Sequence, residues 1–267
     1  MPDLTFENND DFKFEGFGGY DEEVTQGNTG EGEGITRSCM NLVFLLDTSG
    51  SMSFNGGQRI NQLNTAMPIA LSAARDTAAE KEVELFIRII SFNNRAAWVM
   101  GSTEKGVAVD DACNNWRDLS AVGGTDTAAA IRLACTAMRT KYMGTRNYHP
   151  VVILVTDGES NNRADTQNAI EELRNALSGG NPAKKDKVWR FAIGVEGYNE
   201  AELLDFAMLG TKEDDFGNEL PNEPMVFKVD NVADLAKVLK NVTESSLHSA
   251  AAAGDTGTAG EAPIIPI

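Results

Sequence analysis

Three oxygen-bearing side chains, Asp47, Ser49 and Ser51, stand at alternate positions directly after an apolar run. A carboxylate and two hydroxyls, with no sulfur or imidazole nearby, form a donor set that favours a hard cation such as Mg²⁺, Mn²⁺ or Ca²⁺. Asp, Ser and Gly are also ordinary turn residues, so this pattern alone fits a turn after a strand equally well. Other parts of the chain have to decide between these two interpretations.

The apolar run, residues 41–46, has the length and composition of a buried parallel strand that is covered on both faces. It is too short to span a membrane. In open α/β sheets, ligands bind beyond the carboxyl ends of the strands. Asp47 and the two serines that follow it therefore stand where such a fold places a binding site.

Two later segments carry further oxygen donors. Thr125 follows a pair of glycines and precedes a helical pattern, and Asp157 follows a second apolar strand, residues 151–155. Glycines let the backbone bend and come close to a bound ion. Capping of the next helix, by Thr125 or by Asp126, would explain the segment around Thr125 without any metal.

Together, these segments resemble the metal-ion-dependent adhesion site (MIDAS) of the von Willebrand factor type A domain, which uses D-x-S-x-S, a Thr and an Asp from three loops. The resemblance covers about residues 40–247. It implies that Ser49 and Ser51 bind the ion directly, that Thr125 binds it directly or through water, and that the acids often act through water. It also implies one open coordination position for an Asp or Glu of a partner protein. The implied metal ligands are Asp47, Ser49, Ser51, Thr125 and Asp157, and the implied cofactor is Mg²⁺, with Mn²⁺ or Ca²⁺ as alternatives.

Strands alternate with amphipathic helices along the chain, which predicts an α/β fold with a doubly wound, mostly parallel sheet of about six strands and helices on both faces. Residues 83–92 and 96–100 are too close for a helical crossover, so the second is expected to be a short antiparallel edge strand. Pro68 lies inside the first helical pattern and predicts a kink or a helix in two pieces. Asn199 and Glu202 form the pattern of a capping box.

Composition divides the chain into three parts. Residues 1–38 hold ten acidic and two basic residues, which is nearly half of the net charge of −17, and we expect a flexible acidic tail there. Its aromatic residues between Phe12 and Tyr20 could instead dock onto a partner or onto the domain. Residues 39–247 are expected to form the type A domain, and the Ala- and Gly-rich residues 248–267 a flexible C-terminal tail.

The acidic balance argues against nucleic acid and anionic membranes as partners, because phosphate binding needs clusters of Lys and Arg. We expect a cytoplasmic protein, since no secretory leader opens the sequence and the three cysteines lack metal-type spacing. We expect no enzymatic activity. Hydrolysis needs a positioned base, and the sequence has only two histidines. His149 precedes a strand, and His248 lies in the expected C-terminal tail, so neither is placed to act as that base.

The predicted function is a metal-dependent protein–protein interaction module that binds an acidic residue of a partner through a divalent cation. The uninterrupted motifs look like those of bacterial stand-alone family members, including those of tellurium-resistance clusters, so a stress-response or signalling assembly is expected. Three alternatives stay open: a co-subunit of an AAA+ ATPase in metal insertion or complex assembly, a surface adhesion domain and, in a different class, a metal-assisted phosphohydrolase. The sequence leaves the oligomeric state open.

Overall fold

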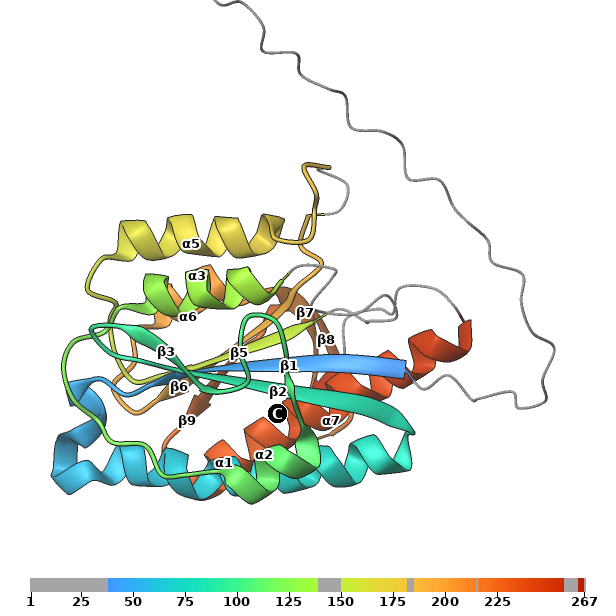
Figure 1. Cartoon of the computed structure of the whole chain (residues 1–267), viewed down its shortest axis with the longest axis horizontal. Coiled ribbons are helices and arrows are strands. Elements are labelled where there is room, and N and C mark those ends of the chain that lie inside the picture. The colour runs from blue at the N-terminus through green and yellow to red at the C-terminus, as the bar shows by residue number, and fades with distance from the viewer. Residues whose placement is uncertain (1–37, 139–149, 182–184, 215, 257–263, 267) are drawn as a thin grey trace, which may run out of the picture. The chain divides into compact units, whose positions relative to one another are not determined.

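A computed structural model describes residues 38–138, 150–181, 185–214, 216–256 and 264–266. In this part of the chain a central sheet lies between two layers of helices, as Figure 1 shows. The predicted acidic tail, residues 1–38, lies outside the described residues except for Ser38, and so do its aromatic residues. None of the described helices is both long and apolar enough to cross a membrane.

The central sheet is built around β1, Ser38–Asp47. This strand pairs in parallel with β2, Val83–Phe92, on one side and with β5, Val151–Thr156, on the other. The sheet continues in parallel beyond β5 with β6, Trp189–Val195, and β9, Val226–Val229. Because the chain builds the sheet outward from β1 in both directions, the strand order reverses between β1 and β5. Ligands in α/β sheets bind at such a point.

The edge of the sheet beside β2 is antiparallel. β3, Ala96–Met100, pairs with the carboxyl half of β2, and β4, Val107–Ala108, pairs with Phe86 and Ile87. The sheet has seven strands, in the order β3-β2-β1-β5-β6-β9 with β4 also on β2. The predicted fold class, a doubly wound and mostly parallel sheet with an antiparallel edge strand, is confirmed. The short strand β4 was not predicted.

Helices cover both faces of the sheet (Figure 1). One layer consists of α1, Phe54–Glu80, α2, Val109–Asn115, and α7, Val232–Thr256. The other consists of α3, Thr127–Ala137, α5, Arg163–Asn175, and α6, Glu200–Phe206. Successive side chains of β1 point to opposite faces, so Phe44 is buried in the core under the first layer and Leu45 in the core under the second. Burial on both faces explains the continuous apolar sequence of this strand.

The helix α1 contains Pro68 and is continuous over its whole length. Of the two outcomes predicted for Pro68, a kink or a helix in two pieces, the second is wrong. Pro68 is exposed, whereas Leu63, Met67 and Leu71 of the same helix are fully buried. Burial of such side chains contributes about 1.5–3 kcal/mol each, which outweighs the roughly 3 kcal/mol that an interior proline costs.

We expected a flexible tail from residue 248 onward, but its described residues, 248–256 and 264–266, have regular secondary structure, and the others lie outside the described part of the chain. The helix α7 continues beyond residue 248, because alanine, the strongest helix former, fills the stretch. Further on, β10, Ile264–Pro266, pairs in parallel with β7, Leu209–Glu213, in a second sheet whose third strand is β8, Glu219–Pro224. Ile265 is fully buried against the main core. This burial favours an ordered strand over a free end.

Candidate metal centre

The predicted metal ligands lie at the carboxyl ends of β1 and β5, which are neighbours in the sheet. Asp47 is the last residue of β1, and the register pairs Leu46 with Val155, one residue before the end of β5. The hydroxyl of Thr156, the last residue of β5, donates a hydrogen bond of 2.6 Å to Asp47 Oδ2. Asp157 follows directly. Parallel pairing thus brings both carboxylates to the same edge of the sheet.

The loop after β1 arranges its side chains in a chain of hydrogen bonds. The Ser49 amide donates to Asp47 Oδ1 at 2.7 Å, which folds the loop back over the carboxylate. The Ser51 hydroxyl donates to Asp157 Oδ1 at 2.7 Å, and Ser49 Oγ lies 2.8 Å from Ser51 Oγ. Since Ser51 gives its proton to Asp157, Ser49 is the donor between the two serines. Four of the five predicted ligands therefore share one network.

The fifth predicted ligand, Thr125, lies on a loop that backbone hydrogen bonds attach to the first loop. The Gly50 amide donates to the Gly123 carbonyl oxygen, and the Val122 amide donates to the Thr48 carbonyl oxygen, both at 2.8 Å. Thr125 is 7 % exposed. The structure thus brings its segment to the same end of the sheet as the other four ligands.

Helix capping does not explain the threonine at this position. The helix α3 begins at Thr127, and its N-cap is Asp126, whose side chain accepts a hydrogen bond of 2.9 Å from the Ala129 amide. Of the two capping residues that the sequence allowed, the structure uses Asp126. The hydroxyl of Thr125 is therefore not needed for the cap.

Two asparagines that the sequence analysis missed hold this loop. Asn94, in the turn between β2 and β3, accepts at Oδ1 a hydrogen bond of 2.7 Å from the Gly124 amide. Asn161 Oδ1 accepts one of 3.1 Å from the Thr125 amide, and the Asn161 amide donates to the Thr125 carbonyl oxygen at 2.8 Å. A Cβ atom on Gly124 would lie 2.6 Å from Asn94 Oδ1, so this close approach requires glycine. The position of both asparagines shortly after a strand was the one signal for them in the sequence.

Both site carboxylates are buried, Asp47 at 0 % and Asp157 at 2 % exposure. Burial raises the pKa of Asp47 to about 6, although its hydrogen bonds with Thr156 and Ser49 act in the opposite direction. Arg59, which the sequence analysis also missed, donates from Nη1 to Asp157 Oδ2 at 2.5 Å. An arginine on an amphipathic helix gives no sequence signal for such a contact.

The donor atoms of these side chains fit a hard divalent cation. The described segments contain no group of three or more His, Cys, Asp or Glu side chains that could hold a metal, so a metal centre here has to include hydroxyl ligands. The network supplies two carboxylates and two serine hydroxyls in mutual contact, and the Thr125 loop is attached to it. Such hard oxygen donors suit Mg²⁺, Mn²⁺ or Ca²⁺.

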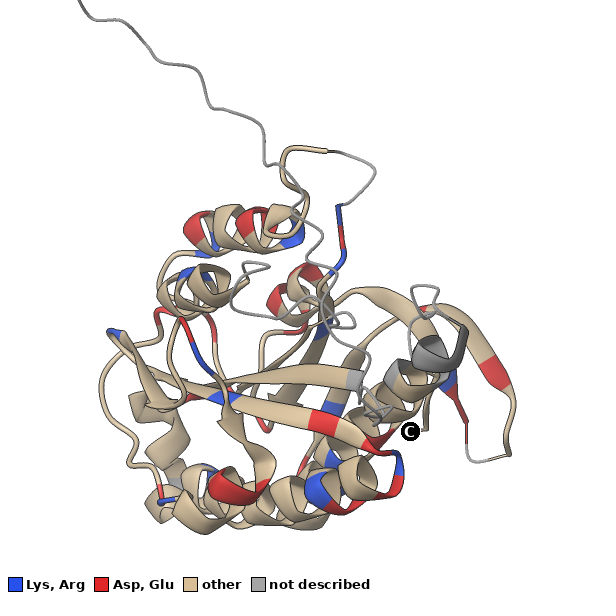
Figure 2. Ribbon diagram, turned by 45° about the vertical axis from the view of Figure 1, so that its right-hand side comes forward, with Lys and Arg blue, Asp and Glu red and all other residues tan. Residues whose placement is uncertain are grey.

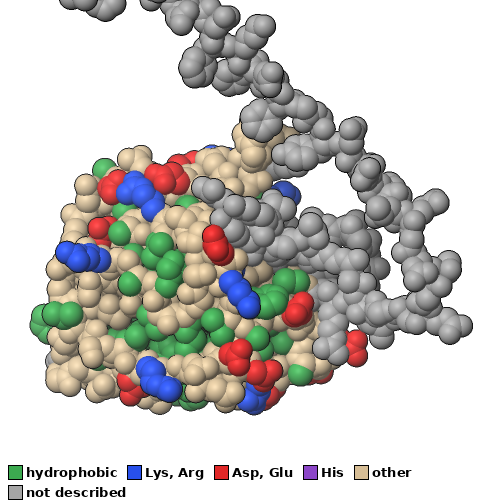
Figure 3. All heavy atoms as spheres, viewed as in Figure 1, with side chains coloured by type: hydrophobic (Ala, Val, Ile, Leu, Met, Phe, Trp, Pro, Cys, Tyr) green, Lys and Arg blue, Asp and Glu red, His purple; other side chains and the backbone are tan. Residues whose placement is uncertain are grey.

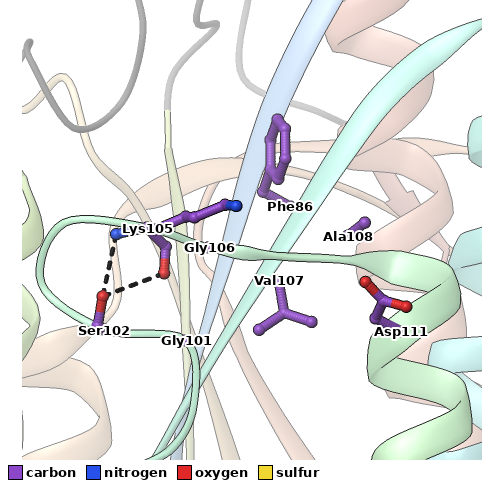
Figure 4. Close-up of a pocket in the computed structure, with 8 residues that line it drawn as sticks. All are labelled: Phe86, Gly101, Ser102, Lys105, Gly106, Val107, Ala108 and Asp111. Carbon is purple, nitrogen blue, oxygen red and sulfur yellow. Dashed lines mark hydrogen bonds between the residues drawn. The ribbon is translucent and has the colours of Figure 1, made fainter.

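A hollow elsewhere on the surface lies over β2 and β4, and Figure 4 shows the residues that line it. Phe86 and Val107 form part of the lining, and its charged residues are Lys105 and Asp111. None of the five predicted ligands belongs to it. Figure 3 shows hydrophobic side chains gathered across the middle of the face seen in Figure 1. We assign no role to this hollow.

Comparison with known proteins agrees with the fold. A family model of the von Willebrand factor type A domain matches residues 41–241. Among solved structures, one described as von Willebrand factor type A from Catenulispora acidiphila is 22% identical, with a TM-score of 0.56; the match covers 79% of this chain and 43% of that one. Among curated proteins, none matches this chain.

Two further solved structures share the fold. Proximal thread matrix protein 1 from the mussel byssus, in a structure with a zinc-occupied MIDAS motif, is 18% identical with a TM-score of 0.52, over 79% of this chain and 46% of that one. The pilus adhesin SpaC from Lactobacillus rhamnosus GG is 14% identical with a TM-score of 0.54, over 79% and 31%. This chain thus spans less than half the length of each solved structure named here. Since the family model matches most of its residues, the chain belongs to the von Willebrand factor type A domain family.

Proposed function

We propose that this chain is a metal-dependent protein–protein interaction module with an intact MIDAS. Ser49, Ser51 and Thr125 bind a divalent cation, Mg²⁺ or else Mn²⁺ or Ca²⁺, and Asp47 and Asp157 balance its charge. When bound, the ion offers an open coordination position to a carboxylate. An Asp or Glu side chain of a partner protein supplies that carboxylate.

The observation that carries this proposal is the hydrogen-bonded network of Asp47, Ser49, Ser51 and Asp157. Ser51 and Asp157 are 106 positions apart in the sequence, yet their side chains bond to each other. Ordinary turn residues would instead face the solvent or their own loop. Arg59 compensates one of the two buried carboxylates, and the remaining negative charge costs free energy unless a further cation compensates it, which a divalent ion would do.

The proposal includes no catalytic step. Proton transfer needs a base within hydrogen-bond reach of the reacting group. Both site carboxylates already accept hydrogen bonds from groups of the protein itself, which supports a binding role. His248 lies near Glu80, at the end of α1 remote from Arg59, and His149 lies outside the described residues.

The proposed partner is a protein and neither nucleic acid nor a membrane. Figure 2 shows the positions of Lys and Arg scattered along the ribbon among those of Asp and Glu. Scattered charges of this kind do not form the basic stripe that phosphate backbones need. The chain as a whole carries a net charge of −17, which adds to the repulsion of polyanions.

The proposed setting is the bacterial cytoplasm, in a stress-response or signalling assembly such as those of tellurium-resistance clusters. The uninterrupted D-T-S-G-S-M and T-D-G-E motifs support this setting. Sequencing of the neighbouring genes tests it, with genes for kinases and phosphatases as the expected result. Genes for an AAA+ ATPase or for a surface anchor in their place would favour one of the alternatives.

The first test of the site is titration of Mg²⁺ and Mn²⁺ into the full chain by isothermal titration calorimetry. We expect a single metal site, and a loss of affinity of about 100-fold in Ser51→Ala, which removes a ligand and its bond to Asp157. Ser53→Ala is the matched control, because Ser53 lies in the same loop but donates to the Gly50 carbonyl oxygen. Equal affinities of these two variants would contradict the proposal.

The second test concerns the partner's carboxylate. A capped peptide with a single aspartate is titrated into the Mn²⁺-loaded protein, and binding is followed by the relaxation of water protons around Mn²⁺. We expect binding that disappears on addition of EDTA and in Asp47→Asn, which keeps the shape of the side chain but removes its charge. Peptide binding that persists in EDTA would show that the metal is not the bridge.

A further inference from the structure

The charged partner of Asp157 in the structure is Arg59, in the first turns of α1. Its Nη1 donates to Asp157 Oδ2 at 2.5 Å, while the other carboxylate oxygen accepts from Ser51. The same nitrogen lies 3.4 Å from the Ser51 carbonyl oxygen. Arg59 thus contacts both the carboxylate and the backbone of the loop that carries the predicted ligands.

The surrounding residues form a slot for this arginine. The side chain of Arg59 is 14% exposed, and its guanidinium carbon lies 5.8 Å from the centre of the Phe54 ring. Gly197, with φ of +89°, leaves room for the guanidinium, since a Cβ atom there would lie 3.0 Å from Arg59 Nη2. Arg59 Nε is buried, has no hydrogen-bond partner among the residues that the structure describes, and lies 3.9 Å from Glu196 Oε2. The guanidinium is therefore held at the site from several elements.

This arrangement determines the charge at the centre of the site. The two buried carboxylates, Asp47 and Asp157, and the guanidinium of Arg59 leave one unit of negative charge. A divalent cation changes this to one unit of positive charge. Without the arginine, the same ion would leave the centre neutral. Because the groups are buried, their charges act on one another with little screening by water.

We propose that Arg59 sets the charge of the metal-loaded site, so that the ion retains one unit of positive charge for a partner's single carboxylate. This inference rests on the proposed function and names a residue that determines its ligand class. Arg59 lowers the affinity of the centre for the metal by direct repulsion, and it raises the affinity of the loaded centre for a monoanionic ligand. A residue that only held Asp157 in place would favour both binding steps.

Two affinities measured on the full chain distinguish these roles. The first is that of Mn²⁺ for the protein, by calorimetry. The second is that of a capped single-aspartate peptide for the protein saturated with Mn²⁺. For Arg59→Gln we expect metal affinity to rise about 10-fold and peptide affinity to fall about 10-fold, since one charge is removed beside both ligands. Arg75→Gln is the matched control: Arg75 lies on the same helix, and its charged partner is Asp76 at the exposed surface.

A second variant tests the same charge effect without unpairing a buried group. Glu196 is 49% exposed and lies beside Arg59. Glu196→Gln therefore removes one negative charge beside the site, which makes the site more positive, with little risk to folding. We expect the opposite changes, a metal affinity about 3-fold lower and a peptide affinity about 3-fold higher. Arg59→Lys, which keeps the charge, should leave the peptide affinity within about 3-fold of the wild type.

The possible results separate this inference from the proposed function. If Arg59→Gln weakens both binding steps, or if Glu196→Gln changes both in the same direction, Arg59 only positions Asp157 and the inference fails while the metal module stands. If the wild-type chain binds no Mn²⁺, both fail together. Opposite changes in the two affinities, reversed in sign between Arg59→Gln and Glu196→Gln, would establish the charge effect.

Discussion

At the scale of single residues, the position of Thr125 depends on Asn161, a side chain from another loop. The Asn161 side chain accepts a hydrogen bond from the Thr125 amide, which Asn161→Ala removes, whereas the bond from the Asn161 backbone amide to the Thr125 carbonyl oxygen remains. We predict that Asn161→Ala lowers the affinity for Mg²⁺ about 10-fold although it removes no ligand, because outer partners hold metal ligands in place. Calorimetric titration of the variant measures this effect directly.

The neighbouring Asn162 provides a matched control for this prediction. Its side chain caps α5 by accepting a hydrogen bond from the Asp165 amide. Asn162→Ala should therefore lower the free energy of unfolding by about 1 kcal/mol and leave the metal affinity unchanged. If both asparagine variants lose metal affinity equally, the loop between β5 and α5 acts as one unit and Asn161 has no separate role.

The five predicted ligands could be found from the sequence because their types and spacing follow two recognisable strands. Asp47 comes directly after one apolar run and Asp157 two positions after another, and the parallel register of those strands places the carboxylates together. The partners of the ligands carry no such signal. Asn94, Asn161 and Arg59 are ordinary residues of a turn, a loop and a helix, and only the folded chain brings them to the site.

At the scale of elements, the C-terminal strand β10 makes a prediction of its own. Ile265 is fully buried, whereas Ile264, its neighbour in the same strand, is 41 % exposed. We predict that Ile265→Ala lowers the free energy of unfolding by about 2–5 kcal/mol and Ile264→Ala by less than about 1 kcal/mol. Urea unfolding of both variants measures the difference. Equal small effects would mean that β10 contributes little to stability in solution.

Elements with a strong apolar pattern were predictable, and elements without one were not. The ranges expected for β2 and β3 agree with the structure, because burial and a short turn leave few other arrangements. The strands β7 and β8 are short and mostly polar, and their side chains are partly or largely exposed, so no alternating pattern marks them. Pairing with β10, distant in the sequence, completes their sheet.

The capping box expected at α6 shows the same limit within a single helix. Asn199 caps the helix as predicted, since its side chain accepts hydrogen bonds from the amides of Ala201 and Glu202. The carboxylate of Glu202, however, accepts a hydrogen bond from the Ser160 amide. A local pattern therefore predicted the cap, whereas a contact 42 positions away determined the role of the glutamate.

At the scale of the whole molecule, the net charge of −17 complicates any test of metal binding. Cations of every kind screen the repulsion within an acidic chain and stabilise its compact state. A rise in melting temperature on addition of Mg²⁺ is therefore expected with or without a specific site. The stabilisation that comes from a specific metal site differs from this screening effect, because it saturates and depends on Asp47 and Asp157.

We predict that Mg²⁺ stabilises the full chain beyond the effect of NaCl at equal ionic strength, by about 2.7 kcal/mol at one hundred times its dissociation constant. Differential scanning calorimetry of the wild type and of Asp157→Asn measures both contributions. The variant should keep the screening effect and lose the specific one, because it lacks one of the two charges that balance the ion. If the wild type and the variant gain the same stability from Mg²⁺, then the ion acts on the surface charge of the chain and the metal centre does not contribute.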